Sequence, residues 1–218
     1  MQRYINLAYL CGDVSTSLDM IMKQEMKKKD NRIQTPTGET TVLLHTCCAP
    51  CSSAIIEAMM NNGITPVIYY CNPNIFPKEE YEIRKNECTR YAQSLGLEII
   101  DADYDHENWL EAMKGLEGEP ERGGRCLKCF KLRLQRTAEY AQQRGIKVIT
   151  TTLASSRWKS LDQINEAGHW ACLSKNVIWW DQNWRKNGLQ ERRNQILKEF
   201  DFYNQLYCGC EFSMRKED

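Results

Sequence analysis

The sequence has no net charge, no long apolar run and no recognisable secretion signal. Its 218 residues carry 29 basic and 29 acidic side chains, which excludes a whole-protein field that attracts nucleic acid but leaves room for local basic patches. No stretch approaches the roughly 18 apolar residues of a membrane span. The N-terminus lacks the basic region, apolar run and small-residue cleavage site of a secretion signal. We therefore expect a cytoplasmic protein without membrane contact.

The cysteine content is unusual for a chain of otherwise ordinary composition. Hydrophobic residues make up 42% of the chain and charged residues 27%, as in typical globular proteins. A chain of this length buries a core without cross-links, yet it contains 11 cysteines. In a reducing cytosol, clustered cysteines serve metal or redox chemistry more often than disulfide bonds.

Strand-like and helix-like segments alternate from residue 41 onward. The predicted strands are residues 41–46, 64–71, 97–104, 146–153 and 177–180, and the predicted helices are residues 52–62, 78–95, 106–116, 126–144, 160–175 and 189–206. The connections are too long for hairpins, so they favour a mostly parallel sheet with helices on both faces. We predict an α/β, Rossmann-like fold with its site at the carboxyl edge of the strands.

A boundary near residue 38 separates two parts of the chain. Residues 23–32 form a polar, Lys-rich run, and the Thr-Pro-Thr-Gly sequence at 35–38 is typical of a connector. We predict an N-terminal extension over residues 1–38 and a single catalytic domain over residues 39–218.

Seven of the cysteines fall into three tight groups. The groups are Cys47, Cys48 and Cys51, then Cys126 and Cys129, and finally Cys208 and Cys210, whereas Cys11, Cys71, Cys88 and Cys172 are isolated. Isolated cysteines usually fill the core, and we expect that role for these four. Cα atoms of adjacent residues lie about 3.8 Å apart, which is short for a disulfide, so Cys47 and Cys48 are better suited to be ligands.

The positions of the groups in the predicted fold support a metal site. The first group follows the first strand at its carboxyl end, where open α/β sheets bind their ligands. The second group opens a helix, whose N-terminus favours thiolate over thiol. Zinc takes four thiolates, and seven exceed that number. A [4Fe–4S] cluster accepts four at irregular spacing and leaves three for a second metal or a redox pair; both metals stay open on spacing alone.

Five motifs together resemble the cobalamin-independent epoxyqueuosine reductase family. They are HTCCAPC at 45–51, YCNPNIFPKEEYEIRKNE at 70–87, ERGGRCLKCFKLRL at 121–134, TTLASS at 151–156 and YCGC at 207–210. The resemblance runs from about residue 41 to 213. It implies reductive removal of the epoxide oxygen from epoxyqueuosine in the anticodon loop of tRNA with GUN anticodons, the last step of queuosine formation. It also implies a [4Fe–4S] cluster, a neighbouring redox or metal centre, and an external electron donor.

The resemblance implies roles for the seven grouped cysteines. Cys47, Cys48, Cys126 and Cys129 match cluster-binding positions, Cys208 and Cys210 match a redox-active pair, and Cys51 is the natural third ligand of a second, mononuclear iron. Turning an epoxide into an alkene and water takes two electrons, whereas the cluster passes one at a time. A Cys208/Cys210 dithiol that becomes a disulfide and an iron held by Cys51, Cys208 and Cys210 both meet this need, and both stay open.

Several polar and aromatic residues near the same edge are candidates for substrate chemistry. Asp103 lies at the carboxyl end of the third predicted strand and is a candidate proton donor. Trp158, between Arg157 and Lys159, is a candidate for stacking on a single-stranded base. The predicted substrate-binding set is Asn72, Asn74, Tyr81, Arg125 and Trp158. His45 lies on an apolar strand and is expected to be a hydrogen-bonded core residue rather than a ligand.

Two other functions compete with the reductase. An ATP-dependent tRNA thiolase carries a Gly-rich loop after its first strand, but here the loop is Cys-Cys-Ala-Pro-Cys without glycine. A zinc-stabilised binding protein without catalysis is the other alternative, and it predicts that Cys208 and Cys210 are dispensable.

Overall fold

A computed structural model describes residues 33–214. Its five-stranded sheet has the order β3-β2-β1-β4-β5, and every neighbouring pair is parallel. The strands are β1 (Thr41–Thr46), β2 (Thr65–Tyr70), β3 (Ile99–Asp101), β4 (Val148–Thr151) and β5 (Ile178–Trp179). The predicted α/β class with a parallel sheet is confirmed.

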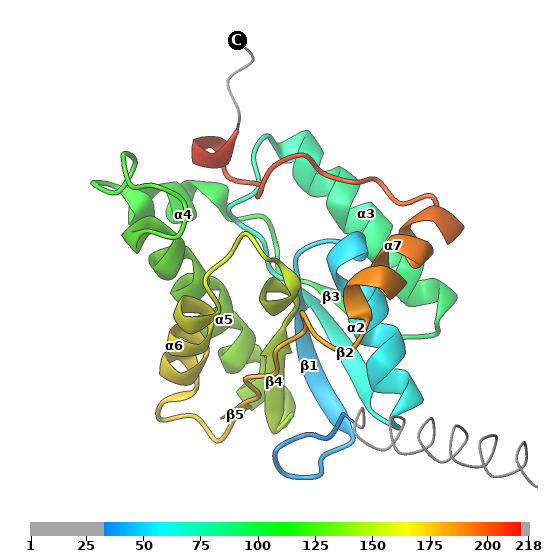
Figure 1. Ribbon diagram of the computed structural model, residues 1–218. Helices are drawn as coiled ribbons and strands as arrows, with labels where there is room; N and C mark the ends of the chain where they lie inside the picture. The colour runs from blue at the N-terminus through cyan, green and yellow to red at the C-terminus, as the bar shows by residue number, and fades with distance from the viewer. Residues whose placement is uncertain (1–32, 215–218) are drawn as a thin grey trace, which may run out of the picture. The chain divides into compact units, whose positions relative to one another are not determined.

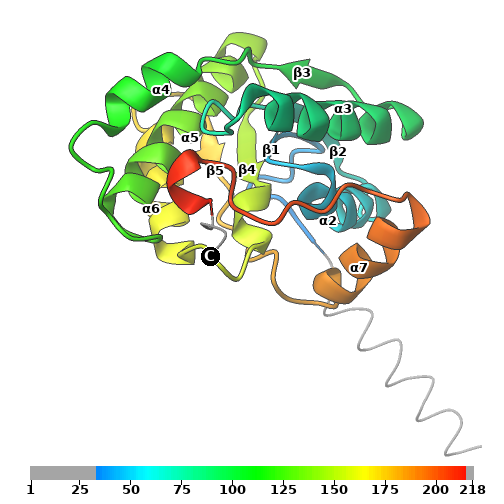
Figure 2. The ribbon, with the colours of Figure 1, turned by 90° about the horizontal axis from the view of Figure 1, so that it is seen from above.

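Helices cover both faces of this sheet (Figures 1 and 2). One face carries α2 (Ala49–Asn61), α3 (Lys78–Ser94) and α7 (Leu189–Glu199), and the other carries α5 (Gly124–Arg144) and α6 (Leu161–Cys172). The short helix α4 (His106–Met113) packs against α5. Two 3₁₀ turns, η2 (Thr152–Ser155) and η3 (Glu211–Ser213), follow β4 and the last cysteine.

The strand order reverses beside β1. The chain runs outward from β1 to β2 and β3, and then crosses to β4 on the other side of β1. Open α/β sheets bind their ligands at such a reversal, beyond the carboxyl ends of the strands. The topology therefore predicts a ligand site among the residues that follow β1 and β4.

The central strand is buried over most of its length. Val42, Leu43 and Leu44 are 0% exposed, as expected for a parallel strand that is covered on both faces. His45 and Thr46 continue the strand and are also 0% exposed. The apolar interior thus ends in a polar layer directly beneath the carboxyl edge of the sheet.

The last predicted helix is shorter than expected. Helix α7 ends at Glu199, whereas the composition predicted a helix to residue 206. Asp201 adopts a left-handed φ of 48°, and the rings of Phe200 and Phe202 pack edge-on against Tyr91 of α3 at 5.1 and 5.2 Å. These aromatic contacts take residues 200–210 off the helix axis and across the carboxyl edge of the sheet (Figure 2).

Other boundaries also differ from the predicted ones, and three of the differences have a clear local cause. Strand β3 has three residues, and the left-handed φ of 59° at Asp103 ends the extended run. Strand β4 ends at Thr151, whose Oγ1 accepts a hydrogen bond from the Leu153 amide at 3.1 Å and begins η2. Helix α2 begins three residues earlier than predicted, with Pro50 in its first turn, where the fixed φ of proline suits a helix start.

Some predictions fall on residues outside the described part. Most of the predicted N-terminal extension, residues 1–38, and Cys11 lie there, so the boundary at residue 38 stays a prediction. Cys71 and Cys88 are buried as expected, and Cys172 is half-buried. Within residues 33–214, no helix has the length and apolar character that crossing a bilayer requires.

The contact between α6 and β5 leaves no room for a side chain at Gly168. A Cβ atom there would lie 2.1 to 2.5 Å from ring atoms of Trp179, which is itself 5% exposed. We expect Gly168→Ala to lower the free energy of unfolding by about 1–3 kcal/mol, because overpacking forces the ring or the strand to move. The measurement is the urea midpoint of the reduced protein.

The matched control is Gly118→Ala. No atom lies within 4 Å of a Cβ at Gly118, so its midpoint should match that of the original protein. Equal midpoints for the two variants would contradict the close packing at Trp179.

Candidate functional site

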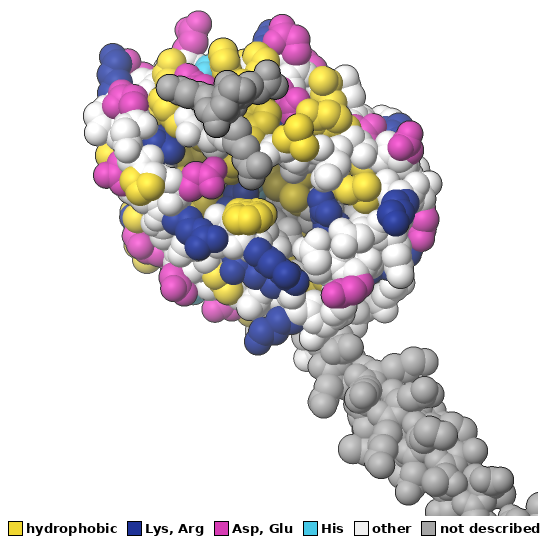
Figure 3. Space-filling model, turned by 45° about the horizontal axis from the view of Figure 1, so that its top comes forward, with side chains coloured by type: hydrophobic (Ala, Val, Ile, Leu, Met, Phe, Trp, Pro, Cys, Tyr) yellow, Lys and Arg dark blue, Asp and Glu magenta, His cyan; other side chains and the backbone are white. Residues whose placement is uncertain are grey.

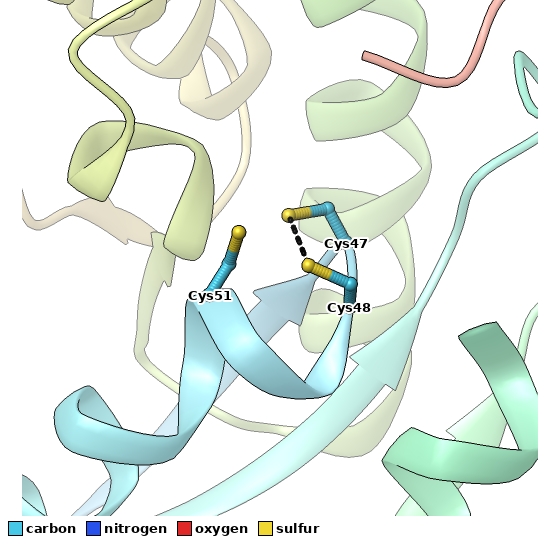
Figure 4. A group of neighbouring side chains, drawn as sticks. All are labelled: Cys47, Cys48 and Cys51. Carbon is cyan, nitrogen blue, oxygen red and sulfur yellow. Dashed lines mark hydrogen bonds between the residues drawn. The ribbon is translucent and has the colours of Figure 1, made fainter. Parts of the chain in front are cut away.

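The first cysteine group lies at the strand-order reversal, between β1 and α2. Cys48 caps the N-terminus of α2, and Cys51 lies in its first turn. The sulfur atoms of Cys47, Cys48 and Cys51 all lie within 4.8 Å of one another, and the two vicinal sulfurs are 3.9 Å apart. Figure 4 shows the three side chains converging on one point. The arrangement is able to hold a metal ion, and three soft thiolates favour iron or zinc.

The three thiols differ in the direction in which their pKa values are shifted. Hydrogen bonds from Cys48 and Cys51 hold the pKa of Cys47 well below its usual range, against the effect of burial. Burial raises the pKa of Cys48, and hydrogen bonding to Cys47 does the same for the pKa of Cys51. Of the three thiols, Cys47 therefore ionises most readily, and a metal that takes all three sulfurs displaces the protons that remain on them.

Two side chains from other elements contact these sulfurs. Thr152, in η2, donates its hydroxyl to Cys47 Sγ at 3.4 Å. Gln205 donates Nε2 to Cys48 Sγ at 2.9 Å, and its Oε1 is buried without a hydrogen-bond partner. Thr152 belongs to the TTLASS motif but was not assigned a role there, and Gln205 was not singled out, because neither residue type is a typical metal ligand.

The other four grouped cysteines lie on α5 and on the C-terminal segment. Cys129 packs with Cys210 in a buried cluster that also contains Trp109 and Met113. The Sγ of Cys126 accepts a hydrogen bond from the Arg122 amide at 3.3 Å. Burial raises the pKa of Cys129 to about 11 and also raises the pKa of Cys126 and of Cys210. In the absence of metal these three are neutral thiols at pH 7.

Two cations connect the cysteine groups. Burial alone would lower the pKa of Lys159, but the charges of Cys208 and Cys47 raise it. Arg133, which is 2% exposed, keeps a raised pKa against burial through Cys129 and Cys47. Each cation thus interacts with thiols from more than one group, so Lys159 and Arg133 couple the cysteines of β1–α2, α5 and the C-terminal segment electrostatically.

His45 supports the floor of this site as a neutral ring. Its Nε2 donates to the Cys71 carbonyl at 3.0 Å, so its Nδ1 accepts from the Thr151 hydroxyl at 2.6 Å. Burial, followed by the charge of Arg133, lowers the pKa of His45 to about 3. The expectation of a hydrogen-bonded core histidine is confirmed.

Three residues of the predicted substrate-binding set are buried. Asn72, Asn74 and Tyr81 are between 0% and 2% exposed. Asn72 donates Nδ2 to the Thr46 carbonyl at 2.9 Å and accepts from Arg133, and the Tyr81 hydroxyl bonds Asp101. Asn72 and Tyr81 therefore have partners within the protein, whereas Asn74 Oδ1 is buried without one. Substrate contact by these residues stays a prediction.

The remaining predicted residues lie in different surroundings. Arg125 is 3% exposed and donates to the carbonyls of Leu116, Glu117 and Glu119, which holds the loop before α5. Asp103 lies exposed after β3, which β2 separates from β1. Trp158 is 75% exposed in the loop that follows η2.

The loop that presents Trp158 is held by two arginines. Arg122 donates Nε to the Trp158 carbonyl and Nη2 to the Arg157 carbonyl, both at 3.0 Å. Arg185 donates Nη2 to the Lys159 carbonyl at 2.8 Å. Figure 3 shows Lys and Arg side chains gathered beside a hollow on this face. Zero net charge thus coexists with a local basic surface.

Residues 42–216 match the model of a protein family described as epoxyqueuosine reductase QueH. The chain is 48% identical over 200 residues to epoxyqueuosine reductase QueH of Haemophilus influenzae, which covers 88% of this chain and 82% of that protein. It is 45% identical over 191 residues to the QueH of Acinetobacter baylyi, covering 87% and 88% of the two chains. The QueH of Thermotoga maritima is 33% identical over 177 residues, covering 80% and 90%.

The hydrogen bonds of Asn72 predict a structural role that is measurable without substrate. We expect Asn72→Ala to lower the free energy of unfolding by about 2 kcal/mol or more, because it removes the hydrogen bonds that the side chain makes to the buried Thr46 carbonyl and to Nη2 of the buried Arg133. The measurement is urea unfolding of the reduced, metal-free protein. The control is Asn108→Ala, because Asn108 is exposed and bonds only Asp105 among the contacts of its side chain described here. An unchanged midpoint for Asn72→Ala would indicate that the side chain is free to bind substrate.

Proposed function

This chain belongs to the epoxyqueuosine reductase QueH family, and on that premise we propose that it reduces epoxyqueuosine to queuosine in the anticodon loop of tRNA. The observation that carries the proposal is the family match over residues 42–216, which contains all seven grouped cysteines. The reaction converts an epoxide, two electrons and two protons into an alkene and water. An external donor supplies the electrons, and we place the reaction in the cytoplasm, where thiols stay reduced.

The donor set fits an iron–sulfur cluster. We assign Cys47, Cys48, Cys126 and Cys129 to a [4Fe–4S] cluster, and Cys51, Cys208 and Cys210 to a mononuclear iron or, for the last two, to a redox dithiol. Thiolate is the ligand that such clusters take, and the interactions of Lys159 and Arg133 support one common site. When bound, the cluster passes electrons singly.

The protein's own residues prepare this site in three ways. Hydrogen bonds from Cys48 and Cys51, in the first turn of α2, lower the pKa of Cys47 and favour its thiolate form. Lys159 and Arg133 offset the negative charge that accumulates when several cysteines lose their protons. Thr152 and Gln205 donate hydrogen bonds to sulfur, which orients ligands and tunes the electronic properties of a bound metal.

Trp158 is the residue best exposed for contact with a base. A single-stranded anticodon-loop base is read by stacking on aromatic rings, and nearby cations bind the phosphates. Trp158 is 75% exposed, and Arg122 and Arg185 fix the backbone beside it. We propose that it stacks on the modified base or its neighbour. Asp103 stays a candidate proton donor.

We expect Trp158→Ala to raise the KM for tRNA about tenfold, because base–aromatic stacking contributes about 1–3 kcal/mol. The thermal midpoint should not change, since the side chain is largely in solvent. The control is Trp170→Ala, because Trp170 is 42% exposed on α6 and distant in sequence from the seven grouped cysteines. Equal KM values for Trp158→Ala and the original protein would exclude stacking at this position.

The reaction itself is tested in cells that lack the protein. We expect their tRNA to accumulate epoxyqueuosine, and we expect the original gene, but not Cys47→Ser or Cys129→Ser, to restore queuosine. Cys172→Ser is the control, because Cys172 is an isolated cysteine. Mass analysis of tRNA nucleosides gives the answer, and normal queuosine in the deficient cells would refute the proposal. A colourless anaerobic preparation with one zinc per chain would favour a zinc-stabilised binding protein.

A further inference from the structure

The segment that carries Cys208 and Cys210 has no helix or strand between residues 200 and 210. We call residues 200–210 the C-terminal strap. It runs beside α3 and crosses the carboxyl edge of the sheet (Figures 1 and 2). A segment without regular secondary structure takes its shape from what it packs against. The contacts of the strap with α3 therefore decide where the two cysteines lie.

A buried ion pair on α3 faces the strap. Arg84 is 2% exposed and Glu80 is 7% exposed, and Arg84 Nε lies 2.7 Å from Glu80 Oε1. Burying such a pair costs desolvation that its own attraction does not reliably offset. The other hydrogen bonds of Arg84 and Glu80 therefore show what the pair stabilises.

Those further bonds all go to the strap. Arg84 donates Nη1 to the Cys208 carbonyl at 3.2 Å and Nη2 to the Tyr207 carbonyl at 3.4 Å. Its guanidinium carbon also lies 5.1 Å from the centre of the Tyr207 ring. Glu80 uses its second oxygen to accept the Tyr203 hydroxyl at 2.8 Å. One ion pair thus fixes the strap at two places, residue 203 and residues 207–208.

The backbone of the strap lies directly on the same surface at Gly209. Gly209 has a φ of 130°, and a Cβ there would lie 3.1 Å from Arg84 Nη1 and 3.1 Å from Ile75 Cγ1. Its carbonyl accepts the Phe76 amide at 2.8 Å. Only glycine adopts this conformation readily. Gly209 separates Cys208 from Cys210. A shift of Arg84 would therefore move the backbone at Gly209 and displace both sulfurs.

We infer that Arg84 and Glu80 are positioning residues that set the Cys208–Cys210 loop opposite the Cys47, Cys48 and Cys51 group. The expected effect on turnover rests on the proposed function, whereas the positioning of the Cys208–Cys210 loop does not. Arg84 touches no reacting atom and acts through the two carbonyls. The planar fork of arginine reaches Glu80 and both carbonyls together, whereas the single ammonium of lysine does not.

The test is Arg84→Lys in the full-length protein loaded with iron under anaerobic conditions. We expect kcat to fall between about tenfold and about a hundredfold, because small displacements of reacting groups cost that much, while the KM for tRNA stays within about twofold. Chymotrypsin should cut the strap about fivefold faster or more, because Leu206 is already 85% exposed. Fragment masses report the cleavage. Unchanged kcat with unchanged strap cleavage would overturn the inference.

The matched control is Arg144→Lys. Arg144 also pairs with a glutamate, Glu98, at 3.1 Å, but it is exposed at the end of α5. Its kcat and cleavage rate should equal those of the original protein. A loss of the same size in this control would assign the effect to arginine replacement in general and overturn the inference.

A second variant covers the case in which Arg84→Lys does not fold. Tyr203→Phe removes only the hydroxyl that bonds Glu80, from a side chain that is 39% exposed, and it keeps the chymotrypsin site. We expect faster cleavage within residues 200–210, and an unchanged rate would overturn the anchoring. Because this assay needs no turnover, it remains decisive even if the protein proves inactive on epoxyqueuosine.

Discussion

Mutual repulsion of negative sulfurs is the constraint on which this structure depends. Cys47, Cys48 and Cys51 converge at the carboxyl edge of the sheet, and each proton lost there leaves a charge close to other sulfurs. Cations from two different elements, Lys159 after β4 and Arg133 within α5, interact with these sulfurs and with those of the other groups. Burial opposes ionisation, and it raises the pKa of Cys48 and of Cys129 even though Arg133 interacts with Cys129. The charge balance of the edge thus determines how many sulfurs are ready for a metal.

The polar layer beneath the cysteines gives this edge its rigidity. Arg133 joins α5 to the segments after β1 and β2 through Asn72 and the Cys71 carbonyl. His45 joins β1 to β4 and to the same carbonyl. Groups that reach a metal site through fully satisfied hydrogen bonds specify one geometry. Arg133 therefore serves both as a counter-charge and as a part of the scaffold.

The sequence predicted the fold better than it predicted the roles of polar side chains. Alternating strands and helices and the grouped cysteines follow from local patterns, and the sheet and the Cys47, Cys48 and Cys51 group match them. The sequence predicted that Asn72 and Tyr81 bind substrate. Only the tertiary structure shows that both side chains are buried and hydrogen-bonded within the protein. The end of α7 was missed for a similar reason, because Tyr91, more than a hundred residues away in sequence, receives Phe200 and Phe202. Arg84 lies in the motif at 70–87, but no pattern indicated its contacts with the strap, and Gln205 belongs to none of the motifs.

The C-terminal strap also bears on how often Cys208 and Cys210 are exposed to solvent. A segment that is tied to α3 by side chains, and not by a ladder of backbone hydrogen bonds, opens locally at a lower free-energy cost than the sheet beneath it. Local opening would therefore expose Cys208 and Cys210 to small molecules more often than Cys47, Cys48 and Cys51, which lie between β1 and α2. The contacts that align the two C-terminal cysteines thus also limit the chemical reactivity of their thiols.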